Sequence, residues 1–154
     1  MTPAISALEA AGIPFGIHEY ERGRELTDFG REAAEALGLP HEQVFKTLVM
    51  ASAQFVAIAV IPVDRRLSLR AAAVALGAKK LVMCDPTLAE RATGYVVGGI
   101  SPIGQKRRHS AVVDASASMQ ELIYVSGGRR GLDVSIAPAD LIRIIDAVVA
   151  PVAG

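Results

Sequence analysis

Residues 44–63 read VFKTLVMASAQFVAIAVIPV. Two apolar runs in this stretch, near Val44–Ala51 and near Phe55–Ile61, are separated only by the short segment 52–54, so we expect two β-strands in direct succession. Strands that follow one another directly do not fit a purely alternating parallel sheet, in which a helix follows each strand. The stretch therefore predicts a mixed α/β fold.

Capping residues and apolar spacing predict the elements around this pair. Four helices are expected to begin at the N-caps Thr2, Thr27, Ser68 and Asp85 and to end at Gly12, Gly38, Gly77 and Gly94. A last helix is expected to carry one stripe of Leu141, Ile144, Ile145, Val148 and Val149. Further strands are expected near residues 14–20, 80–84, 111–114, 121–126 and 132–136, whereas residues 94–104 are turn-rich. The expected architecture is a curved mixed β-sheet with surrounding helices.

Length and composition agree with one folded unit. The chain has 154 residues, of which 51% are hydrophobic, and we expect residues 1–154 to form a single domain with a sizeable core. Its mean hydropathy of +0.37 excludes intrinsic disorder. One cysteine excludes a disulfide framework, and the three histidines lie far apart in the sequence. We therefore predict no metal site and no cofactor.

The apolar segments do not predict a leader or a membrane span. The N-terminus has no basic region and carries Glu9 within its first apolar stretch, which differs from a secretory signal. The longest charge-free apolar run, Leu48–Val63, is interrupted by Ser52 and Gln54 and is shorter than the ~20 residues that a membrane helix needs. We expect no membrane association and a cytoplasmic protein.

Charge is distributed unevenly although the formal net charge is zero. Residues 1–50 hold eight acidic and four basic residues, whereas residues 64–130 hold eleven basic and five acidic residues. Such an asymmetry predicts an anionic partner on one side of the molecule. Candidate nucleic-acid contacts are the basic residues of QKRRH (105–109) and SGGRRGLD (126–133), namely Lys106, Arg107, Arg108, Arg129 and Arg130. The alternatives are a hydrated loop for the first run and a solvated hairpin for the second.

Lys46 is a candidate functional residue because its strand is otherwise apolar. Period-2 alternation puts it on one face with Val44, Leu48 and Met50. A buried ammonium without a partner is costly, so such a lysine either extends along its stem to water or is held for a negatively charged group. Both interpretations are open from the sequence.

The segment TGYVVGGISPIG, residues 93–104, holds the adjacent glycines Gly98 and Gly99. Successive glycines allow the backbone to approach a ligand and to present N–H groups to a carbonyl oxygen or phosphate, although a tight structural turn also explains them. The following serine lacks the G-x-S-x-G frame of a nucleophile elbow.

Other reactive side chains are expected to be structural. Cys84 ends an apolar run, and no histidine or cationic helix start activates it. No feature of the sequence brings Ser101, His109 and Asp114 together as a triad. His18 alternates with apolar neighbours and is expected to be a structural or rim residue.

Several specific motifs occur in one order along nearly the whole chain. They are MTPA, IHEY, DFG at residues 28–30, VFKTLV, ALGAKK, TGYVVGGISPIGQK and YVSGGRRGLD. In this respect the sequence resembles the bacterial YbaK-type aminoacyl-tRNA deacylases, relatives of the editing domain inserted in prolyl-tRNA synthetases. It differs in its neutral APVAG tail and in His109–Ser110 after the basic run, and both differences bear on how tRNA or a synthetase docks.

The resemblance implies an activity and a set of site residues. It implies the mixed α/β fold of the prolyl-tRNA synthetase-associated domain class and trans-editing hydrolysis of cysteine from tRNA(Pro). Lys46 would be the essential pocket lysine, Gly98 and Gly99 would polarise the carbonyl, and the substrate's own thiol would attack its ester. The remaining pocket residues by family pattern are Tyr20, Thr47, Ile100, Ser101, Pro102, Ser126 and Asp133.

Several alternatives to this function stay open from the sequence. The same fold could act on another small aminoacyl group such as alanine. A non-catalytic module that binds tRNA or a synthetase is a second alternative, and a phosphate-binding protein that uses the two glycine loops is a third. The expected partners are tRNA(Pro) charged with cysteine and prolyl-tRNA synthetase.

Overall fold

A computed structural model describes residues 1–21 and 28–154 and divides the strands between two sheets. The first sheet has the antiparallel order β1-β7-β6, with β1 at Gly16–Glu19, β7 at Leu132–Ile136 and β6 at Ile123–Arg129. The second has the order β4-β2-β3-β5-β8, with β4 at Val82–Met83, β2 at Phe45–Ala51, β3 at Val56–Pro62, β5 at Ser110–Asp114 and β8 at Val148–Ala150. The β3–β5 and β5–β8 pairs are parallel and the others antiparallel, so this sheet is mixed.

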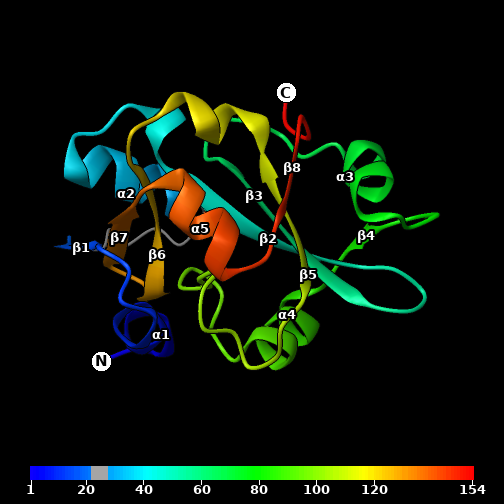
Figure 1. The fold of residues 1–154 in the computed structure, drawn as a ribbon, viewed down its shortest axis with the longest axis horizontal. Helices are drawn as coiled ribbons and strands as arrows, with labels where there is room; N and C mark the ends of the chain where they lie inside the picture. Colours follow the sequence, from blue (N-terminus) through cyan, green and yellow to red (C-terminus); the bar gives the residue numbers. More distant parts are fainter. Residues whose placement is uncertain (22–27) are drawn as a thin grey trace.

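Five α-helices and two short 3-10 helices are described around the sheets. The α-helices are α1 (Pro3–Ala11), α2 (Phe29–Leu37), α3 (Leu69–Leu76), α4 (Pro86–Thr93) and α5 (Pro138–Ile144), and the 3-10 helices are His41–Gln43 and Ala115–Met119. Figure 1 shows β1, β6 and β7 at one end of the molecule near α1 and α2, and α3 and β4 at the other end. Among the described helices, none is long and apolar enough to cross a membrane.

Local capping chemistry defines most helix ends as expected. The side chains of Thr2, Ser68 and Asp85 each accept a hydrogen bond from a backbone N–H in the first turn of their helices. Glycines in the left-handed conformation end four of the helices. The expected cap Thr27 lies outside the described residues, and Asp28 caps α2 by accepting from the Arg31 N–H at 3.2 Å.

Two expectations about the architecture need correction. The mixed α/β class is confirmed, but the strands form two sheets where one was expected; an isolated bridge from Val44 to Tyr124 links them. The last helix is shorter than its apolar spacing predicts. It ends at Ile144, Asp146 follows with a φ of 52°, and Val148–Ala150 pairs with β5 as strand β8.

Buried aliphatic residues fill the space between the sheets and the helices. The largest cluster lies between the two sheets and contains Leu8 of α1, Ile58 and Val60 of β3, and Leu141 of α5. A second cluster packs α3 on the other face of the five-stranded sheet. A third, smaller cluster packs α2 onto the junction of the two sheets. This junction holds the candidate site.

Candidate active site

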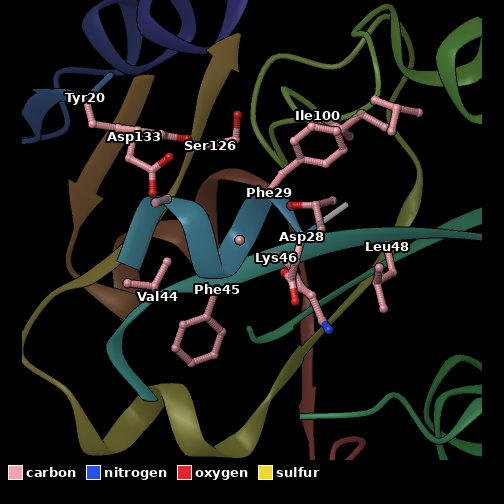
Figure 2. A pocket seen from close by; sticks show the side chains of 15 residues that line it. Tyr20, Asp28, Phe29, Val44, Phe45, Lys46, Leu48, Ile100, Ser126 and Asp133 are labelled. Atoms are coloured by element: carbon pink, nitrogen blue, oxygen red, sulfur yellow. The ribbon is translucent and has the colours of Figure 1, made fainter. Parts of the chain in front are cut away.

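A pocket of about 380 Å³ lies beneath α2, where the two sheets meet (Figure 2). Its volume is near the lower end of the ~300–1,000 Å³ typical of small-molecule sites. The lining residues come from β1, α2, β2, the glycine loop (residues 94–104) and the β6–β7 hairpin. They are Tyr20, Asp28, Phe29, Gly30, Ala33, Val44, Phe45, Lys46, Thr47, Leu48, Val97, Gly98, Ile100, Ser126 and Asp133.

Seven of the ten residues expected from the sequence to form the substrate pocket meet in this pocket. Those that line it are Tyr20, Lys46, Thr47, Gly98, Ile100, Ser126 and Asp133. They come from distant parts of the chain. The residue before β2, Val44, forms an isolated bridge with Tyr124 of β6, and this contact brings the two sheets together beside the pocket. Figure 2 shows Tyr20, Ser126 and Asp133 together at one end and Lys46 at the other.

The first end of the pocket is built around the carboxyl group of Asp133. Asp133 lies on β7, the central strand of its sheet, with His18 and Ser126 as cross-strand neighbours. It is only 4% exposed, and burial raises the pKa of its carboxyl to about 7. Burial, together with the negative charge of Asp133, raises the pKa of Tyr20 to about 12. The hydroxyl of Tyr20 is therefore a hydrogen-bond donor at neutral pH.

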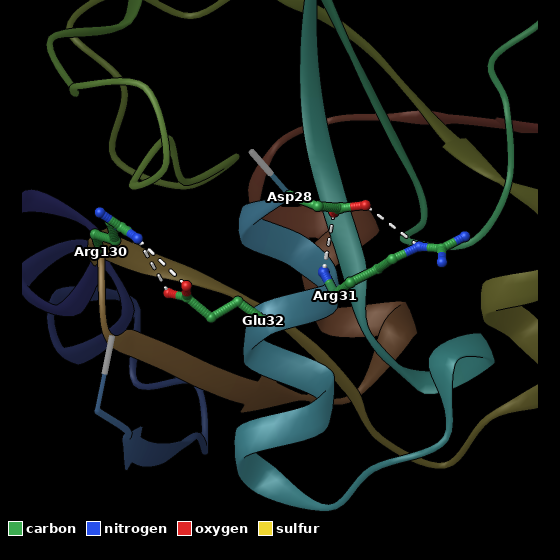
Figure 3. Close-up of polar contacts among 4 residues, drawn as sticks. All are labelled: Asp28, Arg31, Glu32 and Arg130. Carbon is green, nitrogen blue, oxygen red and sulfur yellow. Dashed lines mark hydrogen bonds and ion pairs between the residues drawn. The ribbon is translucent and has the colours of Figure 1, made fainter. Parts of the chain in front are cut away.

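The opposite end of the pocket carries the ammonium group of Lys46. Its Nζ donates to the carbonyl oxygen of Val63 at 3.4 Å, and no ion pair joins it to any residue in the described part of the chain. Partial burial lowers the pKa of Lys46, with Asp28 opposing this shift and Arg31 adding to it. The carboxylate of Asp28 forms an ion pair with Arg31 at 3.3 Å (Figure 3), so it acts on both Arg31 and Lys46.

The wall between the two ends is mostly apolar and holds one unsatisfied hydroxyl. Phe29, Leu48 and Ile100 line it. Thr47 Oγ1 is buried and has no hydrogen-bond partner among residues 1–21 and 28–154. Leaving a buried hydroxyl without a hydrogen bond lowers the stability of the protein by about 1–3 kcal/mol, and a ligand that binds the hydroxyl removes this penalty.

The two glycines differ in what their amides can do. Gly99 was expected to donate to the substrate, but its N–H donates to the Val96 carbonyl oxygen at 2.9 Å and closes a tight turn. Gly98 occupies the third position of this turn with a φ of 92°, as a type II turn requires. Its N–H makes no hydrogen bond within the described ranges, so Gly98 alone keeps an amide for a ligand.

Close approach explains why both positions are glycine. A Cβ on Gly98 would lie 2.9 Å from the ring of Phe29, and one on Gly99 would lie 2.7 Å from Cα of Arg129. The glycine loop therefore packs directly on α2 on one side and on the β6–β7 hairpin on the other. At position 99, glycine allows the backbone of the loop to approach the backbone of the hairpin closely.

Ser101 and Pro102 do not line this pocket, contrary to the expectation, and Pro102 lines a separate depression. Ser101 is fully buried, and its Oγ accepts a hydrogen bond from the Ile103 N–H at 3.2 Å. The Tyr95 hydroxyl donates to the Ile103 carbonyl oxygen at 2.6 Å, and the Val97 N–H donates to Glu90 Oε2 at 2.8 Å. These contacts hold the loop in place.

The basic run Lys106–Arg108 is exposed and lies outside this pocket. Arg107 and Arg108 border a separate depression of about 420 Å³ between α1, α5 and the end of the glycine loop. None of the three side chains forms an ion pair with a described residue. Any contact they make with tRNA is therefore outside the Lys46 pocket.

The two hairpin arginines, which were expected to contact nucleic acid, form ion pairs within the protein. Arg129 pairs with Glu19 at 3.3 Å on the surface. The side chain of Arg130 is 13% exposed and pairs with Glu32 of α2 at 3.3 Å (Figure 3). Its guanidinium carbon also lies over the ring of Phe29, 4.7 Å from the centroid. Arg130 ties the hairpin to α2 and supports the pocket wall.

Several residues of the site had no role assigned from the sequence. Phe29 forms the pocket wall, Asp28 caps α2 beside Lys46, and Glu32 holds Arg130. The only signal was the DFG motif at residues 28–30, which carried the family resemblance without a stated role. Glu90 and Tyr95 hold the glycine loop; Glu90 lies in no recognised motif, and Tyr95 lies in TGYVVGGISPIG, where it had no assigned role.

The side chains considered as a triad are occupied separately. Ser101 accepts from the Ile103 N–H, His109 Nε2 lies 3.0 Å from the Ala92 carbonyl oxygen, and Asp114 accepts from the Val152 and Ala153 N–H groups. Burial raises the pKa of the Cys84 thiol, and Cys84 does not line the pocket. A search of the described residues finds no group of three or more metal-ligating side chains.

Burial of Asp133 predicts a pH-dependent stability. Its pKa is raised from 3.8 to about 7, so between these values the folded protein keeps a proton that the unfolded chain has lost, and stability falls as pH rises. We expect Asp133→Asn to raise the free energy of unfolding by about 2–4 kcal/mol at pH 8 and by little at pH 4. The size follows because each unit by which the folded and unfolded pKa values differ corresponds to about 1.4 kcal/mol. Urea unfolding of both proteins from pH 4 to 8 measures this. A variant less stable than the wild type at pH 8 contradicts the prediction.

Comparison with known proteins places this geometry in a family. The sequence model of the aminoacyl-tRNA editing domain family matches residues 26–144. A relative from Enterococcus faecalis, EbsC, is named provisionally as a Cys-tRNA(Pro)/Cys-tRNA(Cys) deacylase. It is 32% identical over 144 residues, covering 93% of this chain and 87% of the relative.

Two solved structures share the fold. The hypothetical protein APE2540 has a TM-score of 0.87 at 26% identity, covering 99% of each chain. A protein described provisionally as a trans-editing enzyme for prolyl-tRNA synthetase also has a TM-score of 0.87, at 24% identity, covering 99% of this chain and 95% of that one. The latter likeness is one of fold alone.

These findings confirm the resemblance based on the motifs, the mixed α/β editing fold and the enzyme class, an aminoacyl-tRNA deacylase. The chain belongs to the aminoacyl-tRNA editing domain family.

Proposed function

We propose that this protein hydrolyses Cys-tRNA(Pro) in trans, releasing cysteine and tRNA(Pro). The observation that carries the proposal is one small pocket with a carboxyl group, Asp133, at one end and an ammonium group without an ion pair in the described structure, Lys46, at the other. A short aminoacyl ester on the tRNA terminus has the matching polarity. It carries an amino group at one end and the terminal nucleotide at the other.

Catalysis in this proposal depends on positioning and on polarisation of the ester carbonyl. Lys46 and the Gly98 N–H are the candidate groups that stabilise negative charge on the carbonyl oxygen or on the adjacent nucleotide, and one such donor is typically worth ~3–4 kcal/mol. Thr47 offers a further hydroxyl in the same wall. A pocket of this kind is needed because a synthetase site that admits proline discriminates weakly against smaller amino acids, by ~1–3 kcal/mol per methylene.

The attacking group in the proposal is the thiol of the substrate. The thiolate attacks the ester carbonyl, the bond to the ribose oxygen breaks, and that oxygen takes a proton as the tRNA leaves. Water then opens the cyclic thioester to free cysteine. Support comes from the lining of the pocket, which within the described ranges contains no cysteine and no histidine.

A deacylation panel tests the function. Purified protein is incubated with Cys-tRNA(Pro), Ala-tRNA(Pro) and Cys-tRNA(Cys), and release of the amino acid is followed with and without prolyl-tRNA synthetase. We expect hydrolysis of Cys-tRNA(Pro) to exceed that of Ala-tRNA(Pro). Preferred hydrolysis of Ala-tRNA(Pro) makes alanine the substrate, and tRNA binding without release of any amino acid indicates a non-catalytic module.

Serine in place of cysteine on the same tRNA isolates the nucleophile. We expect Ser-tRNA(Pro) to be cleaved at least about 100-fold more slowly than Cys-tRNA(Pro), because a hydroxyl is a far weaker nucleophile than a thiol near neutral pH. Cys84→Ala and Ser101→Ala serve as controls that keep the chemistry. Equal rates for the two esters indicate an activated water, for which Asp133 is the candidate base.

Binding of the tRNA body is proposed to be mainly electrostatic. We expect affinity to fall steeply with salt, and the triple neutralisation Lys106→Gln, Arg107→Gln and Arg108→Gln to flatten that dependence, because each phosphate contact releases a counterion. The charge-matched control neutralises Arg70, Lys79 and Lys80 near α3. Filter binding from about 50 to 200 mM salt measures the slope. A slope equal in the two triple variants removes the basic run from the proposal.

The proposal treats residues 1–154 as one editing domain that works in the cytoplasm, where aminoacyl-tRNA is made. It includes prolyl-tRNA synthetase as a partner that delivers tRNA(Pro). The panel with added synthetase tests this part, because a partner that supplies tRNA identity increases selectivity for Cys-tRNA(Pro) over Cys-tRNA(Cys).

A further inference from the structure

Two aspartates are buried in the described structure, and their carboxyl groups have opposite surroundings. Asp114, 3% exposed, accepts hydrogen bonds from the Ser116 hydroxyl and from the N–H groups of Val152 and Ala153. Although burial acts in the opposite sense, these bonds hold the pKa of Asp114 below its ordinary value. Asp133, 4% exposed, makes no side-chain hydrogen bond and no ion pair with any described residue. Asp114 is thus a structural carboxylate, and Asp133 is not.

Among residues 1–21 and 28–154, the groups around Asp133 do not include an available cation. Its neighbour His18 is engaged through Nε2 with the Ser135 hydroxyl at 2.9 Å. Arg130, whose positive charge acts on Tyr20, is paired with Glu32. The hydroxyl groups of Tyr20 and Ser126 line the same end of the pocket and can share a ligand with the carboxylate. In the part of the chain that the structure describes, this end of the pocket offers a carboxyl group and two hydroxyl groups to a cationic group of a ligand.

The charges at the two ends of the pocket determine which part of the ligand binds at the Asp133 end. Lys46 at the opposite end is suited to the phosphate or carbonyl oxygen of the tRNA terminus, so the aminoacyl group extends toward Asp133 (Figure 2). In a cysteinyl ester the only cationic group is the α-ammonium, which donates charge-assisted hydrogen bonds to a carboxylate. We infer that Asp133, with Tyr20 and Ser126, forms a recognition site for a free α-ammonium group, so that the enzyme rejects aminoacyl esters whose amino group is missing or acylated. This inference rests on the proposed function.

Removal of the amino group alone tests the inference. The two substrates are Cys-tRNA(Pro) and 3-mercaptopropionyl-tRNA(Pro), which keeps the thiol and the ester and lacks only the amine. Each enzymatic rate is divided by the spontaneous hydrolysis rate of the same ester, because the ammonium itself activates the ester. We expect wild-type kcat/KM to favour the cysteinyl ester by about 100-fold, the effect of removing one partner of a buried charge pair.

The variant Asp133→Asn separates recognition from catalysis. We expect it to lose activity on the cysteinyl ester only, so that the preference falls below about 10-fold. Ser135→Ala is the matched control, since Ser135 lies on the same strand and the same face and pairs with His18. If Asp133→Asn loses activity equally on both esters, Asp133 acts in a step common to both, and the inference is wrong. The inference is also wrong if the wild-type enzyme cleaves both esters equally.

If neither ester is hydrolysed, the proposed function is contradicted. A binding measurement then still tests the inference. Calorimetry then compares two stable amide analogues, 3′-cysteinylamino-3′-deoxyadenosine and its deamino counterpart. Tighter binding of the amine by the wild type, lost in Asp133→Asn, supports the ammonium site without turnover. Equal affinities overturn it. If Asp133→Asn does not fold, the paired wild-type rates and affinities give the answer.

Discussion

Lys46→Ala is expected to lower kcat/KM for Cys-tRNA(Pro) by at least about 100-fold with the fold intact. Lys46 lines the pocket and forms no ion pair with a described residue, so its ammonium is available to the negative charge that develops on the substrate. Its side-chain hydrogen bond within the described residues, to the Val63 carbonyl oxygen at 3.4 Å, is too long to contribute much stability. Single-turnover deacylation and thermal unfolding of the same preparation measure both effects.

Three variants define the cause of that loss. Lys46→Met keeps the aliphatic stem and removes the charge, and we expect it to be as inactive as Lys46→Ala. Lys46→Arg keeps the charge with a different shape and should retain part of the activity. Lys80→Ala removes an exposed lysine distant from the pocket and should have no effect. A folded Lys46→Ala protein with near-wild-type turnover makes Lys46 a structural residue and contradicts the proposed mechanism.

Gly99→Ala has the second large expected effect. The added Cβ would lie 2.7 Å from Cα of Arg129 and 2.8 Å from the backbone nitrogen of Arg130, and a backbone contact of this kind is relieved only if the loop or the hairpin moves. We expect a loss of about 1–3 kcal/mol in the free energy of unfolding. We expect kcat/KM to fall by about 100-fold, because Gly98 and Ile100 of the pocket wall move with the loop.

Gly77→Ala is the matched control for this substitution. Gly77 has a φ of +72°, and nothing lies within 4 Å of a Cβ built there. The left-handed conformation costs an alanine about 1–2 kcal/mol, so we expect a stability loss of similar size with unchanged kcat/KM. If Gly99→Ala has the activity of Gly77→Ala, the contact between the loop and the hairpin does not shape the site.

Local hydrogen bonds explain which parts of the fold could be predicted from the sequence. Helix ends at Thr2, Ser68 and Asp85 depend on a side chain and an N–H three residues apart, and the sequence contains both partners. The strand pair of residues 44–63 follows from two apolar runs joined by a short turn. These predictions were confirmed because the hydrogen bonds that define these helix starts and this strand pair join residues close together in the sequence.

The C-terminal segment shows why the same reasoning failed elsewhere. Val148 and Val149 have helical spacing from Leu141, yet they pair in parallel with Val112 and Val113 of β5. That strand edge needs hydrogen-bond partners, and Asp146, with a φ of 52°, turns the chain toward it. Spacing along the chain contains no information about an open edge that lies in a different part of the sequence.

The site divides in the same way. The sequence by itself determined that Lys46 stands on an apolar strand and that the motifs are those of an editing domain. Only the tertiary structure decided that the Gly99 N–H donates to the Val96 carbonyl oxygen, and that Arg130 pairs with Glu32, 98 residues away. Only the tertiary structure left the carboxyl group of Asp133 buried and without a partner among the described residues. The physical reason is that burial and pairing of a charge depend on which distant segments pack around it, whereas caps and strand periodicity depend on neighbours in the chain.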